Sequence, residues 1–328
     1  MNFPLNTYFF AAAAAFAASS LSVPFWRKWC ERLGFVDDPG HRKLHLVTTP
    51  LAGGLAVATG MLAPVGAALL ALHFHFLDPS TMEKLSYGFA RRKFELGAIL
   101  AGAVGMLAIG LWDDRKELKP AVKFIGQAVI ALLVAAGGAR ITLFVDSRAF
   151  SYAVTMVWIL TLTNAFNFMD NMNGLCAGLG AIAALFFGII AAWSGQYLVA
   201  LTAWLTLGAL AGFLPYNYPK ASSFLGDGGS QLAGYLMAIL AILPHFYTAR
   251  HPRALAVLTP VVVLGVTLGD LVWVVVWRWG HGKPFYVGDN NHLSHRLVRR
   301  GLTKENAVLV IWLLSAGAGI LGLWLDRF

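Results

Sequence analysis

The chain has 328 residues, of which 58% are hydrophobic and only 12% charged, and its formal net charge is +9. A soluble domain carries roughly 25% charged residues, and a soluble fold of this length cannot bury so much apolar surface. The composition excludes an ordinary soluble protein and makes lipid the solvent for most of the chain. Nucleic-acid binding is also excluded, because the positive charge is not gathered in a soluble basic module.

Apolar stretches of membrane-spanning length recur along the whole chain. A helix needs about 20 such residues to cross a bilayer, whereas barrel strands alternate and are half as long. We therefore expect an all-α integral membrane protein, a single domain over residues 1–328, with about ten transmembrane helices. The expected spans are Leu5–Trp26, Leu51–Leu77, Phe94–Trp112, Ala121–Ala139, Phe150–Phe168, Leu175–Trp193, Tyr197–Leu214, Gly229–Tyr247, Leu255–Trp277 and Ala307–Leu325.

Basic residues predict the orientation. Sixteen of the 25 Lys and Arg residues fall in the connections after the first, third, seventh and ninth spans, and the positive-inside rule makes that side cytoplasmic. An even number of spans then places both termini outside. No Lys or Arg precedes the first span, so we expect no cleavable signal peptide. On this topology Asp37, Arg115, Lys220 and Lys283 are cytoplasmic, whereas Lys84 and Arg250 are outside.

The first polar motif on the cytoplasmic side is the pair Asp113–Asp114 at the inner end of the third span. Two unit charges about 4 Å apart repel by about 4 kcal/mol at an effective dielectric near 20, so the pair requires a cation. Lys119, Lys123 and Gln127 recur every four residues on the next helix and share one face, which suits an anionic substrate. The alternative is an interfacial pair that is merely solvated beside the basic residues that follow it.

The second motif combines three asparagines with an aspartate at the end of the fifth span. Asn164, Asn167 and Asn171 lie on one helical stripe with Asp170 at its edge, and Asn173 points elsewhere if the helix breaks near Gly174. Such side chains are costly in a membrane unless they line a cavity or pair with one another. We favour a substrate-binding role over simple helix-to-helix hydrogen bonding, which remains the alternative.

The third motif, Gly226-Asp227-Gly228-Gly229-Ser230, directly precedes the eighth span. Glycines let backbone amides approach a ligand, and a helix start offers positive potential to phosphate. Asp227 could hold Mg²⁺ against that phosphate. The alternative is a tight turn with Ser230 as a helix cap.

The fourth motif lies after the ninth span, where His292, His295 and Arg296 favour binding of phosphate groups. Zinc would need further His or Cys ligands, which we do not find, and an amphipathic surface helix is the alternative. The loop after the first span adds Asp38, Lys43 and His45, which alone indicate only a basic turn region.

Together the motifs resemble those of the polyprenyl-phosphate N-acetylhexosamine-1-phosphate transferase family. The matching residues run from about 37 to 297: Asp38…Arg42-Lys43-x-His45…Gly53-Gly54, Gly110-x-x-Asp113-Asp114…Lys123…Gln127, Asn164-x-x-Asn167-x-x-Asp170…Gly174, Gly226-Asp227-x-Gly-Ser230 and His292-x-x-His295-Arg296.

The resemblance implies transfer of a sugar 1-phosphate from a UDP-N-acetylhexosamine to undecaprenyl phosphate, with release of UMP. It implies an active site on the cytoplasmic face of a bacterial inner membrane and a role at the first step of a cell-envelope glycan pathway. A homodimer is left open. Asp227 becomes the Mg²⁺ ligand, with Mn²⁺ as an alternative ion, and Asp113 and Asp114 engage the lipid phosphate. Asp170 joins Asp113 and Asp114 as a catalytic residue, and the asparagines around it line the nucleotide pocket. Lys43, His45 and Lys123 bind substrate, and the histidine motif helps to bind the phosphates.

Two departures from the family pattern bear on the donor. Asn173 stands where the family usually has an aspartate near the uracil; asparagine still accepts a hydrogen bond but lacks the charge. His292 to Arg296 also lack the consecutive histidines of the muramoyl-pentapeptide branch, which favours a GlcNAc-type enzyme. The competing functions are a membrane prenyltransferase that binds Mg²⁺-diphosphate and a secondary transporter. Transport is disfavoured because the acidic residues gather at one membrane face and not at the midplane.

Overall fold

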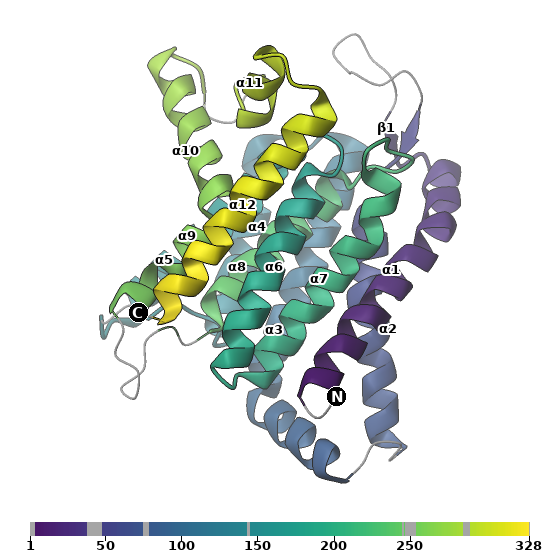
Figure 1. Ribbon diagram of the computed structural model, residues 1–328, viewed down its shortest axis with the longest axis vertical. Coiled ribbons are helices and arrows are strands. Elements are labelled where there is room, and N and C mark those ends of the chain that lie inside the picture. Colours follow the sequence, from purple (N-terminus) through teal and green to yellow (C-terminus); the bar gives the residue numbers. More distant parts are fainter. Residues whose placement is uncertain are drawn as a thin grey trace.

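The protein is an all-helical bundle with one very short β-ribbon, as seen in a computed structural model (Figure 1). The structure describes residues 4–37, 48–74, 79–142, 145–244, 246, 254–284 and 289–327. The long helices are α1 Leu5–Leu33, α2 Gly53–His73, α3 Pro79–Lys116, α4 Pro120–Ala136, α5 Arg148–Met169, α6 Leu175–Trp193, α7 Tyr197–Asn217, α8 Gly226–Ile242, α10 Gly265–Gly280 and α12 Lys304–Arg327. The short elements are strands β1 Val36–Asp37 and β2 Thr49–Pro50, the 3₁₀ helix Ala254–Leu258, α9 Thr259–Val263 and α11 Leu293–Arg299.

Each of the ten apolar stretches predicted from the sequence coincides with helical structure. Among the described residues, seven helices are long and apolar enough to span a membrane, or eight if a bent pair counts as one span. The bent pair is Leu255–Val263 followed by Gly265–Gly280, with an angle of 71° between the two parts. Helices α4 and α8, at 17 residues each, are shorter. The protein is therefore an all-α membrane protein, and the ninth predicted stretch is broken at Leu264.

Helix α8 is the centre of the bundle, because nearly all of its residues from Gly228 to Ala241 are buried. It packs against α2, α3, α5 and α6. Glycines permit the closest of these contacts: a Cβ on Gly54 would lie 2.6 Å from the Gly229 nitrogen, and one on Gly110 would collide with the Asp227 carbonyl. The start of α8 is therefore held rigidly against α2 and α3.

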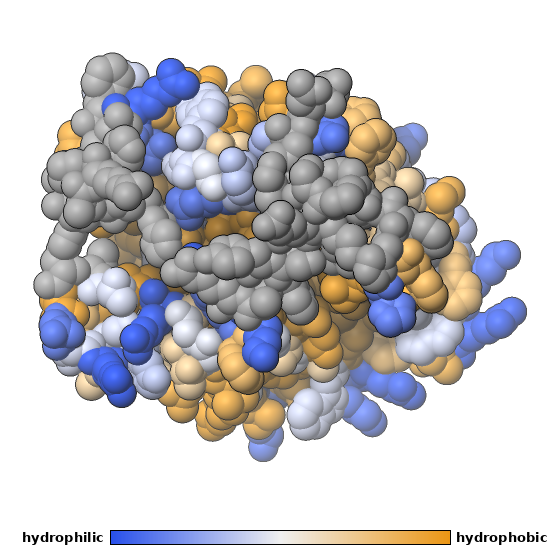
Figure 2. Space-filling model, turned by 90° about the horizontal axis from the view of Figure 1, so that it is seen from below, coloured by the Kyte–Doolittle hydropathy of each residue, from blue (hydrophilic) through white to orange (hydrophobic). Residues whose placement is uncertain are grey.

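The outer helices expose apolar side chains, as contact with lipid requires. Phe10, Leu21, Ile125, Leu133 and Leu313 are each more than 60% exposed. Seen from the end that lies away from β1 and α11, apolar side chains also extend around the flanks of the molecule (Figure 2).

The two chain termini lie at one end of the molecule, and the β-ribbon lies at the other (Figure 1). Helix α1 begins and α12 ends in the half opposite β1 and α11 (Figure 1). Strands β1 and β2 pair in antiparallel register, with Val36 opposite Pro50 and Asp37 opposite Thr49. This ribbon brings together the two sides of the first connection at the same end of the bundle as the predicted polar motifs.

Candidate active site

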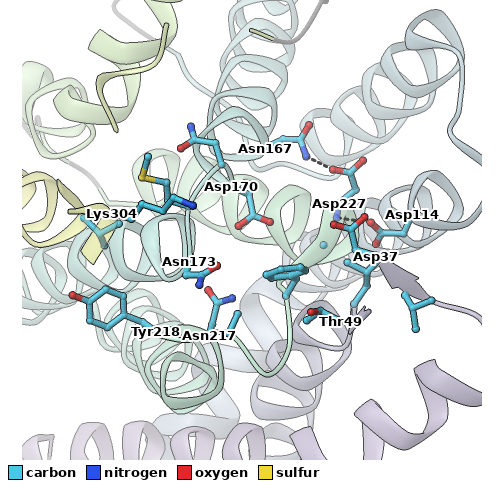
Figure 3. A pocket seen from close by; sticks show the side chains of 18 of the residues that line it. Asp37, Thr49, Asp114, Asn167, Asp170, Asn173, Asn217, Tyr218, Asp227 and Lys304 are labelled. Carbon is cyan, nitrogen blue, oxygen red and sulfur yellow. Dashed lines mark hydrogen bonds between the residues drawn. The ribbon is translucent and has the colours of Figure 1, made fainter. Parts of the chain in front are cut away.

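A cavity of about 880 Å³ opens at the end of the bundle where α3 and α5 finish and α8 and α12 begin. Residues of the β-ribbon, the α5–α6 turn, the end of α7 and α11 complete its walls. Figure 3 shows Asp170 projecting into this space from the end of α5, with Lys304 and Asn173 among the residues around it. Seven of the predicted site residues line the cavity: Asp113, Asp114, Asn167, Asp170, Asn173, Asp227 and His295.

Lys123 joins three of the predicted motifs. Its ammonium group lies 2.6 Å from Asp113 Oδ2, 3.2 Å from Asp227 Oδ2 and 3.1 Å from Asn167 Oδ1. These partners come from α3, α8 and α5, so one cation on α4 holds the ends of three helices together. A single positive charge between two carboxylates leaves this corner of the cavity with a net negative charge, which suits a further cation.

Asn167 places the carboxylate of Asp227. Its Nδ2 donates to Asp227 Oδ1 at 2.6 Å and to Ser230 Oγ at 2.9 Å. Ser230, considered above as a cap for its own helix, accepts from Asn167 instead. Because the side chain of Asp227 retains 35% of its exposure, its carboxylate remains open to a ligand in the cavity.

Asp114 has a different role from its neighbour. Its Oδ1 accepts a hydrogen bond from the Asp227 nitrogen at 2.7 Å, and its Oδ2 accepts one from the Gly228 nitrogen at 3.0 Å. No side chain from α8 itself caps that helix. Asp114 therefore caps α8 from α3, in the manner of an N-cap carboxylate. Both of its oxygens are committed to the turn that carries Asp227, a contact that the sequence analysis did not foresee.

Asp170 comes directly after Met169, the last residue of α5. Burial, together with the negative charges of Asp227 and Asp114, raises the pKa of Asp170 to about 8. A carboxyl group in this state readily takes up a proton or a cation near neutral pH.

Asn173 and Asn217 shape the turn between α5 and α6. Asn173 Nδ2 donates to the Pro219 carbonyl at 3.1 Å, which leaves its Oδ1 as the acceptor for a ligand. Asn217 accepts from the Gly174 nitrogen at 2.7 Å and donates to the Ser223 carbonyl. Gly174 has a φ of +76° and a Cβ there would meet Tyr218, so glycine is needed at this position.

Asn164, predicted to bind substrate, is not among the residues that line the cavity. Its Nδ2 donates to Gln127 Oε1 at 2.8 Å, and Gln127 Nε2 donates to Gln231 Oε1 at 3.0 Å. Each of these three amides lies one helical turn from a residue of the cluster: Asn164 from Asn167, Gln127 from Lys123 and Gln231 from Asp227. The amides therefore form a second layer beneath the cavity. The physical reason is helix geometry: three residues along α5 move a side chain about 4.5 Å further along the helix axis.

The three residues of the histidine motif do not lie at one site. His295 lines the cavity, and burial lowers its pKa, with His292 and Arg299 lowering it further. His292 is buried and contacts Asp270 Oδ2 through Nδ1 at 2.6 Å. The guanidinium carbon of Arg296 lies 4.2 Å from the centre of the Trp273 ring. Arg296 lines a separate cavity of about 300 Å³. Only one of the three residues predicted to bind substrate here therefore lines the main cavity.

Part of the predicted site cannot be placed. Lys43 and His45 lie outside the described residues, as do Asp38 and Arg42. The two ends of that connection are described, and Asp37 and Thr49 both line the cavity.

The comparisons with known proteins point to one family. The profile of glycosyl transferase family 4 matches residues 96–245. The chain is 30% identical over 313 residues to a probable undecaprenyl-phosphate N-acetylglucosaminyl 1-phosphate transferase of Bacillus subtilis, covering 92% of this chain and 81% of the relative. It is 34% identical to a decaprenyl-phosphate N-acetylglucosaminephosphotransferase of Mycobacterium tuberculosis, covering 88% and 74%. A third relative, at 24% identity covering 92% and 79%, is the undecaprenyl-phosphate alpha-N-acetylglucosaminyl 1-phosphate transferase of Escherichia coli K12.

The chain belongs to the polyprenyl-phosphate N-acetylhexosamine-1-phosphate transferase family. It is an enzyme that transfers a sugar 1-phosphate. The family assignment made from the motifs is confirmed, and the prenyltransferase and transporter alternatives are set aside.

The side chains at the cavity can hold Mg²⁺ only if the substrate supplies further ligands. Among the described residues, no three His, Cys, Asp or Glu side chains lie close enough together to hold a metal ion. Mg²⁺ is commonly held by one or two carboxylates together with substrate phosphates and water. The partly exposed carboxylate of Asp227 fits that mode.

The sequence analysis missed two residues that line the cavity and one buried carboxylate outside it. Lys304, in the first turn of α12, lines the cavity, but in the sequence it is one of many loop cations. Asn217 lies just before a proline-containing turn and carries no motif signal. Asp270 did offer a signal, because an isolated carboxylate within an apolar span indicates a buried polar partner.

Proposed function

We propose that the protein transfers N-acetylglucosamine 1-phosphate from UDP-N-acetylglucosamine to undecaprenyl phosphate. The observation that carries this proposal is the cluster in which Lys123 contacts Asp113, Asp227 and Asn167, three residues that line the cavity. The names of the relatives support the same reaction class, with acceptors that are polyprenyl phosphates in each case.

In this reaction an oxygen of the lipid phosphate attacks the phosphorus that carries the sugar. A new P–O bond forms, the P–O bond to the nucleoside phosphate breaks, and UMP leaves with the bonding electrons. The lipid phosphate has a second pKa near about 6, so most of it is dianionic at neutral pH. A strong general base is therefore not required, and charge neutralisation and positioning are the main tasks of the protein.

We infer that Asp227 holds Mg²⁺, with Mn²⁺ as an alternative ion. When bound, the ion would neutralise the charge of the pyrophosphate and of the departing UMP. Asn167 and Asp114 support this role, because they fix the side chain and the backbone of Asp227 respectively.

Lys123 and His295 would bind the phosphate groups directly, and Asp113 would act through Lys123. Lys123 offers its ammonium group to the anions, and Asp113 orients that ammonium through the 2.6 Å contact. His295 reaches the same cavity from α11. Asn173 Oδ1 is the acceptor that we assign to the nucleotide base, since its Nδ2 is used by Pro219.

We also infer the arrangement in the membrane. We assign ten spans, both termini outside and a cytoplasmic cavity, an assignment supported by the ten helical segments and the positive-inside rule. The position of the start of α1 and the end of α12 in the same half of the molecule supports an even number of spans. The corresponding membrane is the bacterial inner membrane.

The orientation can be tested by labelling single cysteines with a membrane-impermeant thiol reagent. In a background that lacks the buried Cys30 and Cys176, we expect cysteines at 37, 115, 220 and 283 to label from the cytoplasmic side only. Cysteines at 84 and 250, the second of which lies outside the described residues, should label from the opposite side only. A mixed pattern within either group would mean that the number of spans is wrong.

The activity is tested by incubating the purified protein with undecaprenyl phosphate, Mg²⁺ and a panel of UDP-sugars. UMP release is expected with UDP-N-acetylglucosamine only when the lipid is present, and it should stop when EDTA removes the metal. Failure of every UDP-sugar to yield UMP would contradict the proposal. A preference for another UDP-sugar would keep the reaction class and change the donor.

A further inference from the structure

Asp270 is a buried carboxylate outside the cavity that the proposed reaction does not use. It lies in α10, the second part of the bent span, and is only 5% exposed. A carboxylate within a membrane protein is costly unless it is well paired. Its presence in a largely apolar helix therefore calls for partners, and each of its two oxygens has one.

Both partners belong to the start of α11. Asp270 Oδ2 lies 2.6 Å from His292 Nδ1, and Asp270 Oδ1 accepts a hydrogen bond from the Leu293 nitrogen at 2.6 Å. His292 is the N-cap residue of α11, and its side chain makes no capping bond of its own. The carboxylate on α10 thus caps α11 and holds the ring of His292 through its Nδ1 atom.

Helix α11 has only seven residues, so it is too short to be stable without such contacts. One turn after His292 it presents His295 to the cavity. Two further contacts orient it: Ser294 Oγ donates to Asn171 Oδ1 at 2.6 Å, and Arg296 covers the ring of Trp273. Trp273 is on α10, one turn after Asp270, so α10 holds α11 at two successive points.

The connection that leads into α11 is fixed to the same helix. The Nε of Arg278, a side chain with 1% exposure, lies 2.8 Å from Asp289 Oδ2, and Asp289 Oδ1 accepts from the Asn291 nitrogen. The contacts from α10 to α11 and to the connection before it therefore fix the position of His295 more than α11 itself does.

We propose that Asp270 is a positioning residue for the transfer reaction: by binding His292 and the first amide of α11, it holds His295 at the cavity. This inference rests on the proposed function, because it takes the phosphate groups of the substrates as the partners of His295. It links the bent span to the substrate site, so that a displacement of α10 moves His295.

The kinetic test is a double-mutant cycle. Asp270→Leu keeps the branching and the number of heavy atoms of the side chain but removes both bonds. We expect kcat to fall about 10²-fold, since a displacement near 1 Å has that effect on a positioned group. Asp270→Asn, which can still accept from Leu293, should lose less. In the His295→Ala background, Asp270→Leu should lower kcat by no more than about threefold. Multiplicative losses in the double variant, or parent activity in Asp270→Leu, would overturn the proposal.

The control is Thr267→Val, a volume-matched change at another buried polar residue of α10, which is expected to keep parent activity. A second measurement does not depend on catalysis. His295→Cys, without Cys30 and Cys176, should react with a maleimide at a rate that changes at least about tenfold on adding Asp270→Leu, whereas Lys304→Cys should not change. An unchanged rate at 295 would overturn the proposal. If the parent releases no UMP, the proposed function fails while this labelling still tests Asp270.

Discussion

Replacing Asp227 with asparagine is expected to lower UMP release by about 10³-fold or more, on the scale of lost electrostatic stabilisation at a reacting centre. Lys123 and Asn167, which contact this residue, carry no carboxylate. Both oxygens of Asp114 already accept hydrogen bonds from backbone amides, so Asp114 does not take the place of Asp227 as a metal ligand. Asparagine keeps the shape and an acceptor for the existing hydrogen bonds, so the melting temperature should stay within about 3 °C of the parent.

Two measurements accompany this prediction. Binding of Mn²⁺ in the presence of UDP, followed by electron paramagnetic resonance, should be lost in Asp227→Asn. Ser230→Ala is the matched control, because it removes the other acceptor of Asn167 without removing a carboxylate, and its effect on turnover should be below about tenfold. Full turnover in Asp227→Asn would exclude Asp227 as the metal ligand.

The fold was predictable because membrane helices are marked by composition over long windows. Each of the ten apolar stretches coincides with helical structure, with ends that differ by a few residues or, for α3, by more. Among the described residues, seven helices, or eight if the bent pair counts as one span, are long and apolar enough to cross a membrane. Helix α8 begins at Gly226 and not at Gly229 because Asp114, 113 residues earlier in the chain, caps it. A cap supplied by another helix leaves no local sequence signal. The break at Leu264 was not foreseen, although the following Gly265 is a residue type that often accompanies helix kinks.

The site was predictable as a set of motifs but not as a set of contacts. Spacing placed Asn164, Asn167 and Asn171 on one face of the helix. Residues on one face still lie at different heights along the helix axis, so they need not reach the same partner. Consequently only Asn167 contacts Asp227, while Asn164 binds Gln127 and Asn171 binds Ser294.

The same limit applies to the histidine motif. His292 and His295 were expected to face one ligand because they are three residues apart. His292, however, is the cap residue before α11, so helical spacing does not apply to it, and the carboxylate of Asp270 holds it elsewhere. A partner 22 residues away on another helix is visible only in the folded protein.

Asp113→Asn is expected to lower kcat about 10²-fold while changing the KM for the UDP-sugar by less than about threefold. Asp113 is buried, accepts from the Leu118 nitrogen at 2.8 Å and lies 2.6 Å from the ammonium of Lys123. Asparagine can keep the first of these bonds but loses the charge that orients Lys123. If the pair acts on the lipid phosphate in the transition state, the loss belongs to turnover and not to nucleotide binding.

Asp114→Asn is the comparison that separates orientation of Lys123 from support of the fold. Its carboxylate accepts two backbone hydrogen bonds from α8, and asparagine can accept only one of them. We therefore expect Asp114→Asn to lower the melting temperature as well as kcat, whereas Asp113→Asn should lower kcat alone. Steady-state kinetics with lipid and nucleotide varied separately, together with melting curves, distinguish the two. If the whole effect of Asp113→Asn falls on the KM for the nucleotide, Asp113 serves the donor and the roles of the two substrates at this wall must be exchanged.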